Sequence, residues 1–224
     1  SPRFIGGTII LEYDECDMKE VEMVVEGVTI KGILEVPKET KGLVLFVHGA
    51  GSSRFSPRNN FVAKELNKEM MATLLLDLLT EEEDAVYENR FDIDLLTERL
   101  KEVTLWCRQN PELRNLKIGY FGGSTVSAAA LIGAVKEKNI SAVVSRGGRP
   151  DLAMEVLDQV VIPTLLIVGG NDDGVIELNQ QAFDKLKCEK KIEIVPGATH
   201  LFEEPGTLEQ VAKLATDWFS KYLV

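Results

Sequence analysis

The sequence predicts an α/β fold with a doubly wound, mostly parallel sheet that begins with an antiparallel hairpin. Three observations predict it. Short apolar runs rich in strand-forming residues alternate with longer segments whose apolar residues recur at helical spacing, and this order repeats to the end of the chain. The apolar runs are continuous, which is typical of strands buried on both faces of a parallel sheet. Each run ends in a polar or glycine-containing loop, so we expect these loops to gather at one edge of the sheet.

The chain divides into a short N-terminal segment and a single domain. Residues 1–20 are mixed and acidic, and we expect a tail, a linker or, at residues 7–11, an additional edge strand. Residues 21–224 show no internal repeat, and their length suits one large domain with a buried core. The longest expected connection, residues 80–91, is too short to hold a separate lid, so the predicted fold has no cap domain.

The first half of the domain supplies a hairpin and two buried strands. Residues 21–26 and 28–36 surround Glu26-Gly27, a turn signal between two strand-forming runs. Residues 42–47 form a continuous apolar strand that a glycine-rich loop follows. The other expected elements of this half are a helix at 60–70, a buried strand at 72–79 and a helix at 92–109, which Asn110-Pro111 ends.

The second half repeats the order of strand, loop and helix. A strand that begins at Lys117 turns sharply into an Ala-rich helix. The elements expected after it are strands at 142–145, 164–168 and 191–195, helices at 150–157 and 176–186, and a C-terminal helix that begins with a capping box of Thr207 and Gln210. Val211, Leu214, Trp218 and Tyr222 give this last helix one apolar face.

Composition excludes several classes of function. The net charge of −11 argues against a nucleic-acid or anionic-membrane surface. The apolar runs are too short to cross a bilayer, and residues 1–20 lack a basic region followed by an apolar one, so we expect no signal peptide. Cys16, Cys107 and Cys188 are spaced like neither a disulfide framework nor a metal knuckle, and two histidines exclude a histidine-rich metal site. We therefore expect a cytoplasmic protein with no metal or organic cofactor and no nucleic-acid or membrane partner; its oligomeric state stays open.

The most informative motif is Gly122-Gly123-Ser124, between a strand and the Ala-rich helix. Glycine permits the strained backbone of a sharp strand-to-helix corner. A serine at that corner would expose its hydroxyl above the sheet edge, at the positive end of the next helix. The motif alone also allows a second interpretation, in which Ser124 is the N-cap of an ordinary helix.

Three loops carry candidate catalytic residues in a fixed order: Ser124 follows one strand, Asp172 a later one and His200 the last. Serine is a weak nucleophile, so it needs an imidazole to take its proton and a carboxylate to orient that imidazole. Asp172 is favoured over Asp173 because it lies nearer the strand end. Asp77 also ends a strand, but it precedes the serine and does not fit this order.

Acyl transfer also needs donors for the oxyanion of the tetrahedral intermediate. The backbone N–H of Thr125, directly after the serine, is one candidate. The backbone N–H of Ala50, in the glycine-rich loop, is the other. A phosphate-cradling role for that loop is disfavoured because no Gly-Lys-Ser/Thr follows it. His48 begins the loop and is expected to be structural.

Four arginines lie in loops at the expected active edge, and Arg54 and Arg146 are candidates for binding an anionic part of a substrate. The alternative is that Arg54, Arg58, Arg146 and Arg149 pair with the acidic loop at 81–84.

Several motifs occur together between about residue 21 and the C-terminus, namely LFVHGAGSSR at 45–54, SPRN at 56–59, GYFGGST at 119–125, SRGGRPD at 145–151, VGGND at 168–172 and GATHLFEEPG at 197–206. In these motifs the chain resembles the dienelactone-hydrolase-like branch of the α/β-hydrolases, in its serine-nucleophile form. The resemblance implies an α/β-hydrolase fold without a cap, with Ser124 as nucleophile, Asp172 as acid and His200 as base.

Two departures limit the resemblance. Members of this type usually carry glycine where Val126 stands, and we expect Gly147 and Gly148 to leave room for this valine. Dienelactone hydrolases proper carry cysteine in place of Ser124, so their lactone substrate is not transferred to this chain. Relatives of the serine type are sometimes fused to phosphoribosyltransferase domains, and residues 1–20 would suit the remnant of such a junction.

The leading functional hypothesis is a soluble serine hydrolase whose partner is a small-molecule carboxylic ester or lactone. Two alternatives stay open. The first is a catalytically weak or inactive hydrolase-fold protein that acts as a binding module, and the feature that favours it is Val126 in place of the usual glycine. An acyltransferase would use the same three residues with an acceptor other than water.

Overall fold

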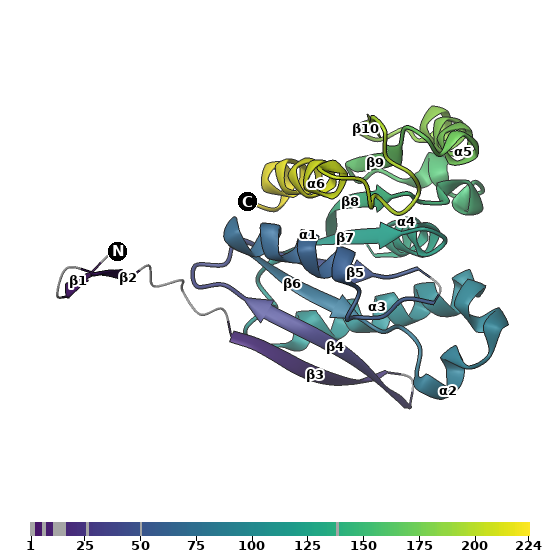
Figure 1. Ribbon diagram of the computed structural model, residues 1–224. Coiled ribbons are helices and arrows are strands. Elements are labelled where there is room, and N and C mark those ends of the chain that lie inside the picture. The colour runs from purple at the N-terminus through teal and green to yellow at the C-terminus, as the bar shows by residue number, and fades with distance from the viewer. Residues whose placement is uncertain (1–2, 6–7, 11–16, 26, 50, 138) are drawn as a thin grey trace.

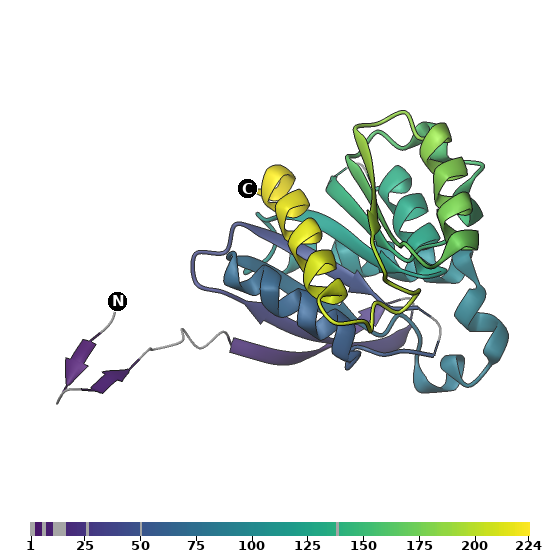
Figure 2. The ribbon, with the colours of Figure 1, turned by 45° about the horizontal axis from the view of Figure 1, so that its top comes forward.

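The computed structural model describes residues 3–5, 8–10, 17–25, 27–49, 51–137 and 139–224. Its main feature is one twisted sheet between two layers of helices (Figures 1 and 2). Among the described residues the sheet has eight strands, in the spatial order β10-β9-β8-β7-β5-β6-β4-β3. The strands are β3 (Asp17–Val25), β4 (Val28–Val36), β5 (Gly42–Val47), β6 (Met71–Leu76), β7 (Lys117–Gly123), β8 (Ile140–Arg146), β9 (Thr164–Gly169) and β10 (Lys190–Val195).

The sheet is parallel except around β4, which runs antiparallel to both β3 and β6. Strand β5 lies between β6 and β7, so the chain winds outward in both directions from β5. Every residue of β5 and β6 is buried, as the continuous apolar runs predict. The predicted doubly wound sheet with an N-terminal hairpin is confirmed.

The helices cover both faces of the sheet. They are α1 (Pro57–Lys68), α2 (Glu81–Asp84), α3 (Ile93–Gln109), α4 (Val126–Lys136), α5 (Asp173–Lys185) and α6 (Thr207–Leu223), with short 3₁₀ helices η1 (Tyr87–Phe91), η2 (Pro150–Ala153) and η3 (Leu157–Gln159). Helices α1 and α6 pack on one face around Phe46, Phe121 and Phe219. Helices α3, α4 and α5 pack on the other face around Leu100 and Tyr120. The predicted apolar face of α6 is therefore the face that contacts the sheet.

The N-terminal region differs from the expected boundaries. Strand β3 begins at Asp17, four residues before the predicted start at 21, because its pairing with β4 continues as far as Val36. Strands β1 (Arg3–Ile5) and β2 (Thr8–Ile10) pair antiparallel in a separate two-stranded sheet. The strand expected at 7–11 thus overlaps β2, while residues 7 and 11 lie outside the described residues.

Two helix starts also differ. Thr207 is the first residue of α6 rather than its cap, and its hydroxyl donates to the Glu204 carbonyl, so the predicted capping box is wrong. A capping box occurs instead at Thr80 and Glu83, inside the segment expected to be a loop, where it begins α2. The helix expected at 150–157 is divided into η2 and η3.

The carboxyl ends of β5, β7, β8 and β9 lead into loops that hold the motifs singled out above. The order of strands reverses at β5, and a crevice at the carboxyl edge forms where such a reversal occurs. Among the residues that the structure describes, none of the helices combines the length and the apolar character needed to cross a bilayer.

Candidate active site

Ser124 occupies a strained corner between β7 and α4. Its φ of 51° lies in the left-handed region, which is costly for a residue with a Cβ atom. Several bonds hold the corner in place. The Ser124 N–H donates to the Arg146 carbonyl at 3.3 Å, and the Ser124 carbonyl accepts from the Arg149 N–H at 3.0 Å and from the Ser127 hydroxyl at 2.8 Å.

Close packing around this corner depends on glycine. A Cβ atom on Gly122 would stand 2.8 Å from the Ser127 Cα, so only glycine lets α4 come this near to β7. On the opposite side, a Cβ atom on Gly49 would stand 3.0 Å from the Ser124 Cβ. The glycine-rich loop after β5 therefore packs directly against the serine.

Thr125 precedes the first residue of α4 and is its N-cap. The amides at a helix N-terminus have no acceptor within the helix, and the first backbone donors recorded in this turn are Ser127 and Ala128. The Thr125 N–H is thus not consumed by the helix ladder. Ala50, the other candidate oxyanion donor, lies outside the described residues.

His200 and Asp172 form a close pair. The His200 Nδ1 lies 2.7 Å from the Asp172 Oδ2, and the two side chains are 40% and 19% exposed. Because a carboxylate only accepts hydrogen bonds, Nδ1 is the donor, which leaves Nε2 as the acceptor of the neutral ring. Asp173 is instead the first residue of α5.

A two-residue segment at the end of β8 joins Ser124 to His200. Arg146 accepts the Ser124 N–H, and the next residue, Gly147, adopts a φ of 51°. A Cβ atom on Gly147 would stand 3.2 Å from the His200 carbonyl oxygen and 3.5 Å from its Cε1. The candidate nucleophile and the candidate base therefore contact the same short segment.

His48, Asp77 and Arg54 form a second polar cluster beside Gly49. The His48 Nε2 lies 3.1 Å from the Asp77 Oδ1, which also accepts the Arg54 N–H at 2.6 Å, and the Arg54 Nη1 donates to Asp77 Oδ2. Burial acts to raise the pKa of Asp77, but the hydrogen bonds from His48 and Arg54 outweigh it, so the pKa lies below its usual value. Arg54 is thereby committed to Asp77.

Arg146 differs from the other arginines of this edge. Its Nε and Nη1 are buried and have no hydrogen-bond partner among the described residues, and its Nη2 points at Gly123. Burial, and then the charge of Arg58, lowers the pKa of Arg146 to about 10.

Pairing with the acidic loop at 81–84 was the alternative for these arginines, and it is wrong for three of them. Arg54 binds Asp77, Arg58 binds Glu203 at 3.1 Å, and Arg149 binds Asp151 at 2.8 Å.

The compensation expected around Val126 is also wrong. Val126 is 2% exposed and packs within the apolar cluster of α3 and α4. The atoms nearest to a Cβ on Gly148 belong to Ser145 and Ser127, and those nearest to one on Gly147 belong to His200 and Phe202. These glycines make room for Ser127 and the His200 loop rather than for the valine.

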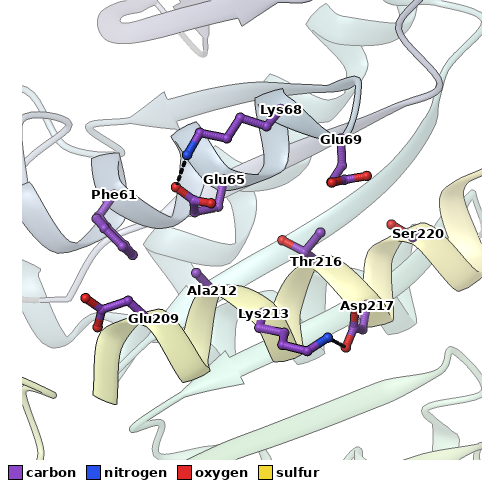
Figure 3. A pocket seen from close by; sticks show the side chains of 10 residues that line it. All are labelled: Phe61, Glu65, Lys68, Glu69, Glu209, Ala212, Lys213, Thr216, Asp217 and Ser220. Atoms are coloured by element: carbon purple, nitrogen blue, oxygen red, sulfur yellow. Dashed lines mark hydrogen bonds and ion pairs between the residues drawn. The ribbon is translucent and has the colours of Figure 1, made fainter. Parts of the chain in front are cut away.

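A separate hollow of about 420 Å³ lies between α1 and α6, away from these residues (Figure 3). Four of its charged side chains pair within their own helices, Lys68 with Glu65 at 2.5 Å and Lys213 with Asp217 at 2.8 Å. None of the candidate site residues lines it. In the described part of the chain, no group of three histidine, cysteine, aspartate or glutamate side chains is placed to hold a metal ion.

Sequence reasoning missed the role of Asp77. The signal was present: β5 and β6 are parallel neighbours with Val47 opposite Leu76, so the next residue of each strand, His48 and Asp77, must face each other. Both lie at the carboxyl edge directly after a buried strand.

Comparison with known proteins connects the chain to hydrolases. The model of the dienelactone hydrolase family matches residues 63–223. A crystal structure of a dienelactone hydrolase from Anabaena variabilis ATCC 29413 is 50% identical, with a TM-score of 0.91 over 93% of this chain and 99% of that one. Est1E from Butyrivibrio proteoclasticus shares the fold at 15% identity, with a TM-score of 0.75 over 90% of this chain and 98% of that one.

Longer relatives carry a different name. Proteins called putative phosphoribosyl transferases from Mycobacterium tuberculosis, strains CDC 1551 / Oshkosh and ATCC 25618 / H37Rv, are each 54% identical over 206 residues. These residues make up 92% of this chain but 46% of each relative, so the chain spans about half the length of the curated relatives it matches. Name and length together fit the expected fusion of such relatives to phosphoribosyltransferase domains.

Proposed function

The chain belongs to the dienelactone hydrolase family, and we propose that it is a serine hydrolase that cleaves small carboxylic esters or lactones. The family and the esterases among its structural neighbours support a hydrolase-fold, esterase-like function. One observation supports the finer proposal. The Arg146 carbonyl holds the strained corner at Ser124, and the next residue, Gly147, packs against His200. The His200 ring is itself paired with the Asp172 carboxylate.

In the proposed acylation step, His200 Nε2 takes the Ser124 hydroxyl proton as the Oγ attacks the ester carbonyl. Asp172 holds the ring through Nδ1 and stabilises the imidazolium that forms. The backbone N–H groups of Thr125 and Ala50 stabilise the oxyanion. The carbon–oxygen bond to the alcohol breaks, His200 returns the proton to that alcohol, and Ser124 keeps the acyl group.

Deacylation reverses these roles. His200 removes a proton from water, the hydroxide attacks the acyl carbonyl, and the Ser124 Oγ leaves with the proton that His200 gives back. The products are a carboxylic acid and the free enzyme. An acceptor alcohol in place of water would make the same cycle an acyl transfer.

Arg146 is the proposed contact for an anionic part of the substrate. Its support is that Nε and Nη1 are buried without a partner among the described residues. The third nitrogen, Nη2, lies 2.9 Å from where a Cβ atom on Gly123 would stand, next to Ser124. A carboxylate accepts two parallel N–H bonds from a guanidinium. We expect an ester with a carboxylate in its acyl part to have a lower KM than its amide-capped analogue, and Arg146→Met to remove that difference.

A fluorophosphonate probe tests the central proposal because it forms a stable bond with an activated serine. We expect wild type to be labelled and Ser124→Ala to be silent while keeping its circular dichroism spectrum. Ser220→Ala is the matched control, since Ser220 lies in the hollow between α1 and α6. Labelling of a folded Ser124→Ala protein to the wild-type extent would rule out Ser124 as the nucleophile.

A further inference from the structure

Asn179 is a polar residue in the middle of α5, and its side chain is fully buried. Its Nδ2 donates two hydrogen bonds, one to the Gly148 carbonyl at 2.9 Å and one to the Val175 carbonyl at 2.8 Å. Its Oδ1 is buried and has no partner among the described residues. A buried oxygen in this state costs free energy, and asparagine forms helices less readily than leucine does. The helix alone therefore does not explain an asparagine at this position.

Gly148 lies in a segment, residues 146–149, that contacts both Ser124 and His200. The first residue of this segment accepts the Ser124 N–H at 3.3 Å through its carbonyl, and the last residue donates its own N–H to the Ser124 carbonyl at 3.0 Å. Between them, a Cβ atom on Gly147 would stand 3.2 Å from the His200 carbonyl oxygen. The place of this segment therefore sets how the candidate nucleophile lies relative to the candidate base.

The other hydrogen bond of Asn179 reaches the helix turn that carries Asp172. Asp172 is the N-cap of α5, and its carbonyl accepts the N–H groups of Val175 and Ile176 at 2.9 Å each. The carbonyl of Val175 is in turn the second acceptor of Asn179. One buried amide thus joins the turn behind Asp172 to the segment 146–149.

The rest of α5 offers little to fix its N-terminal half. Asn179 and Ala182 are the only buried residues of this helix, all of whose residues the structure describes. Lys190 donates to carbonyl groups at the far end of the helix. A single buried methyl group contributes little to holding a helix in one orientation. The hydrogen bond to Gly148 is therefore a large part of what sets the start of α5 against the sheet.

We propose that Asn179 is a positioning residue which holds Asp172, and through it His200, in place against Ser124. The positioning role rests on the proposed function, whereas the attachment of α5 does not. Without the amide, the start of α5 is free to move relative to the segment 146–149, and Asp172 moves with it. The His200 ring then loses its fixed orientation toward the Ser124 hydroxyl. Proton transfer slows, although no group that contacts the substrate has been removed.

Asn67 supplies a matched control for this role. It is also a buried asparagine on a helix, and its Nδ2 donates to the Met71 carbonyl at 3.0 Å and to the Thr73 hydroxyl at 3.1 Å. Met71 begins β6, so this amide lies toward the edge of the sheet opposite to the candidate site. A loss that comes only from removing a buried amide should appear in both asparagines.

The kinetics of ester hydrolysis separate the two residues. We expect Asn179→Ala to lower kcat about tenfold with little change in KM, a smaller loss than the ~10²-fold that a misplacement of 1 Å can cause. Asn67→Ala should lose stability in thermal unfolding and keep its kcat. Asn179→Leu, which replaces the amide by an apolar side chain, should behave as Asn179→Ala does and serves where the smaller residue does not fold. Equal kcat in the Asn179 and Asn67 variants overturns the positioning role.

Ring-carbon NMR of His200 tests the attachment of α5 without any substrate. The Asp172 carboxylate keeps the ring proton on Nδ1, whereas a neutral ring without this partner is free to carry the proton on Nε2. At alkaline pH, where imidazole rings are neutral, we expect the Nδ1–H form in wild type and in Asn67→Ala, and a mixture of both forms in Asn179→Ala. His200→Asn assigns the signals, since the chain has two histidines.

An unchanged Nδ1–H form in folded Asn179→Ala overturns the proposal, because Asp172 would then keep its place without the amide. Absence of ester hydrolysis in the wild type would instead refute the proposed function. The NMR result would still decide whether Asn179 holds the pair of Asp172 and His200.

Discussion

At the scale of single residues, the site depends on how each polar group is partnered. The His200 ring contacts one carboxylate through Nδ1, and its Nε2 has no partner among the described residues, which suits proton transfer. Both ring nitrogens of His48 face an acceptor. Arg54 and Arg146 looked equivalent in the sequence as candidate anion-binding residues. The structure separates them, because Arg54 is neutralised by Asp77 and two guanidinium nitrogens of Arg146 have no partner among the described residues.

The partners of Asp77 give stability a defined dependence on pH. Its pKa is lowered in the folded protein, so its contribution is present above the unfolded-state value of about 4 and is lost as the pH falls through the lower folded value. Asp77→Asn should lower the free energy of unfolding at pH 7 by about 1–3 kcal/mol, because it removes hydrogen bonds to a charged group. Urea unfolding at pH 7 and at pH 3 should show the difference from wild type shrinking at the acid end; a constant difference would contradict this assignment.

At the scale of elements, the sequence predicts most strands and helices. It does not predict which residues cap the helices or which side chains pack together at the ends of the elements. Continuous apolar runs identified the central strands, since complete burial leaves a signal that needs no partner to be read. The prediction of a capping box at Thr207 was wrong because the spacing of a threonine and a glutamine does not show which residue is the N-cap of the helix. Gly148 was expected to make room for Val126, but it packs against Ser127 instead. That contact depends on how α4 lies against η2, which the sequence does not show.

Gly148 gives a test of how tightly these ends are joined. A Cβ atom there would overlap the hydroxyls of Ser145 and Ser127, which are both fully buried. Gly148→Ala should cost about 1–3 kcal/mol of stability through overpacking and should slow ester hydrolysis, since Ser127 supports the Ser124 carbonyl. Gly174→Ala in α5 is the control, because nothing lies within 4 Å of its Cβ position. Equal stability of the two variants in thermal unfolding would show that the corner adapts.

Val126 is the first residue of α4. Its side chain is 2% exposed and belongs to the apolar cluster beneath the corner. Val126→Gly restores the residue usual in the family, yet it removes buried apolar area and adds a flexible residue to a helix, so we expect a loss of about 2–3 kcal/mol. Activity should stay within a few-fold of wild type. A tenfold or larger gain in kcat/KM for a short ester would show that the valine weakens the enzyme and would favour the binding-module hypothesis.

At the scale of the whole molecule, the winding of the sheet brings distant residues to one edge. The reversal at β5 places the loops after β5 and β7 side by side, so Gly49 touches Ser124 across 75 positions of sequence (124 − 49). The order of Ser124, Asp172 and His200 predicted three strand ends on that edge, and the structure has them there. Asp77 was set aside because its place in the sequence did not match the order of the triad, although its strand is the direct neighbour of the strand before His48.

The connections over this edge also set the expected size of the substrate. Between β6 and α3 the chain adds only α2 and η1, four and five residues long, and the described residues include no inserted domain. Without an inserted domain, a site at this edge would offer little apolar surface to a long acyl chain and no lid for a lipid surface to open. We expect kcat/KM to fall from acetate and butyrate esters to laurate esters of the same alcohol, with no jump in rate when the substrate passes its critical micelle concentration. Preference for laurate, or such a jump, would mean that a closing segment covers the site.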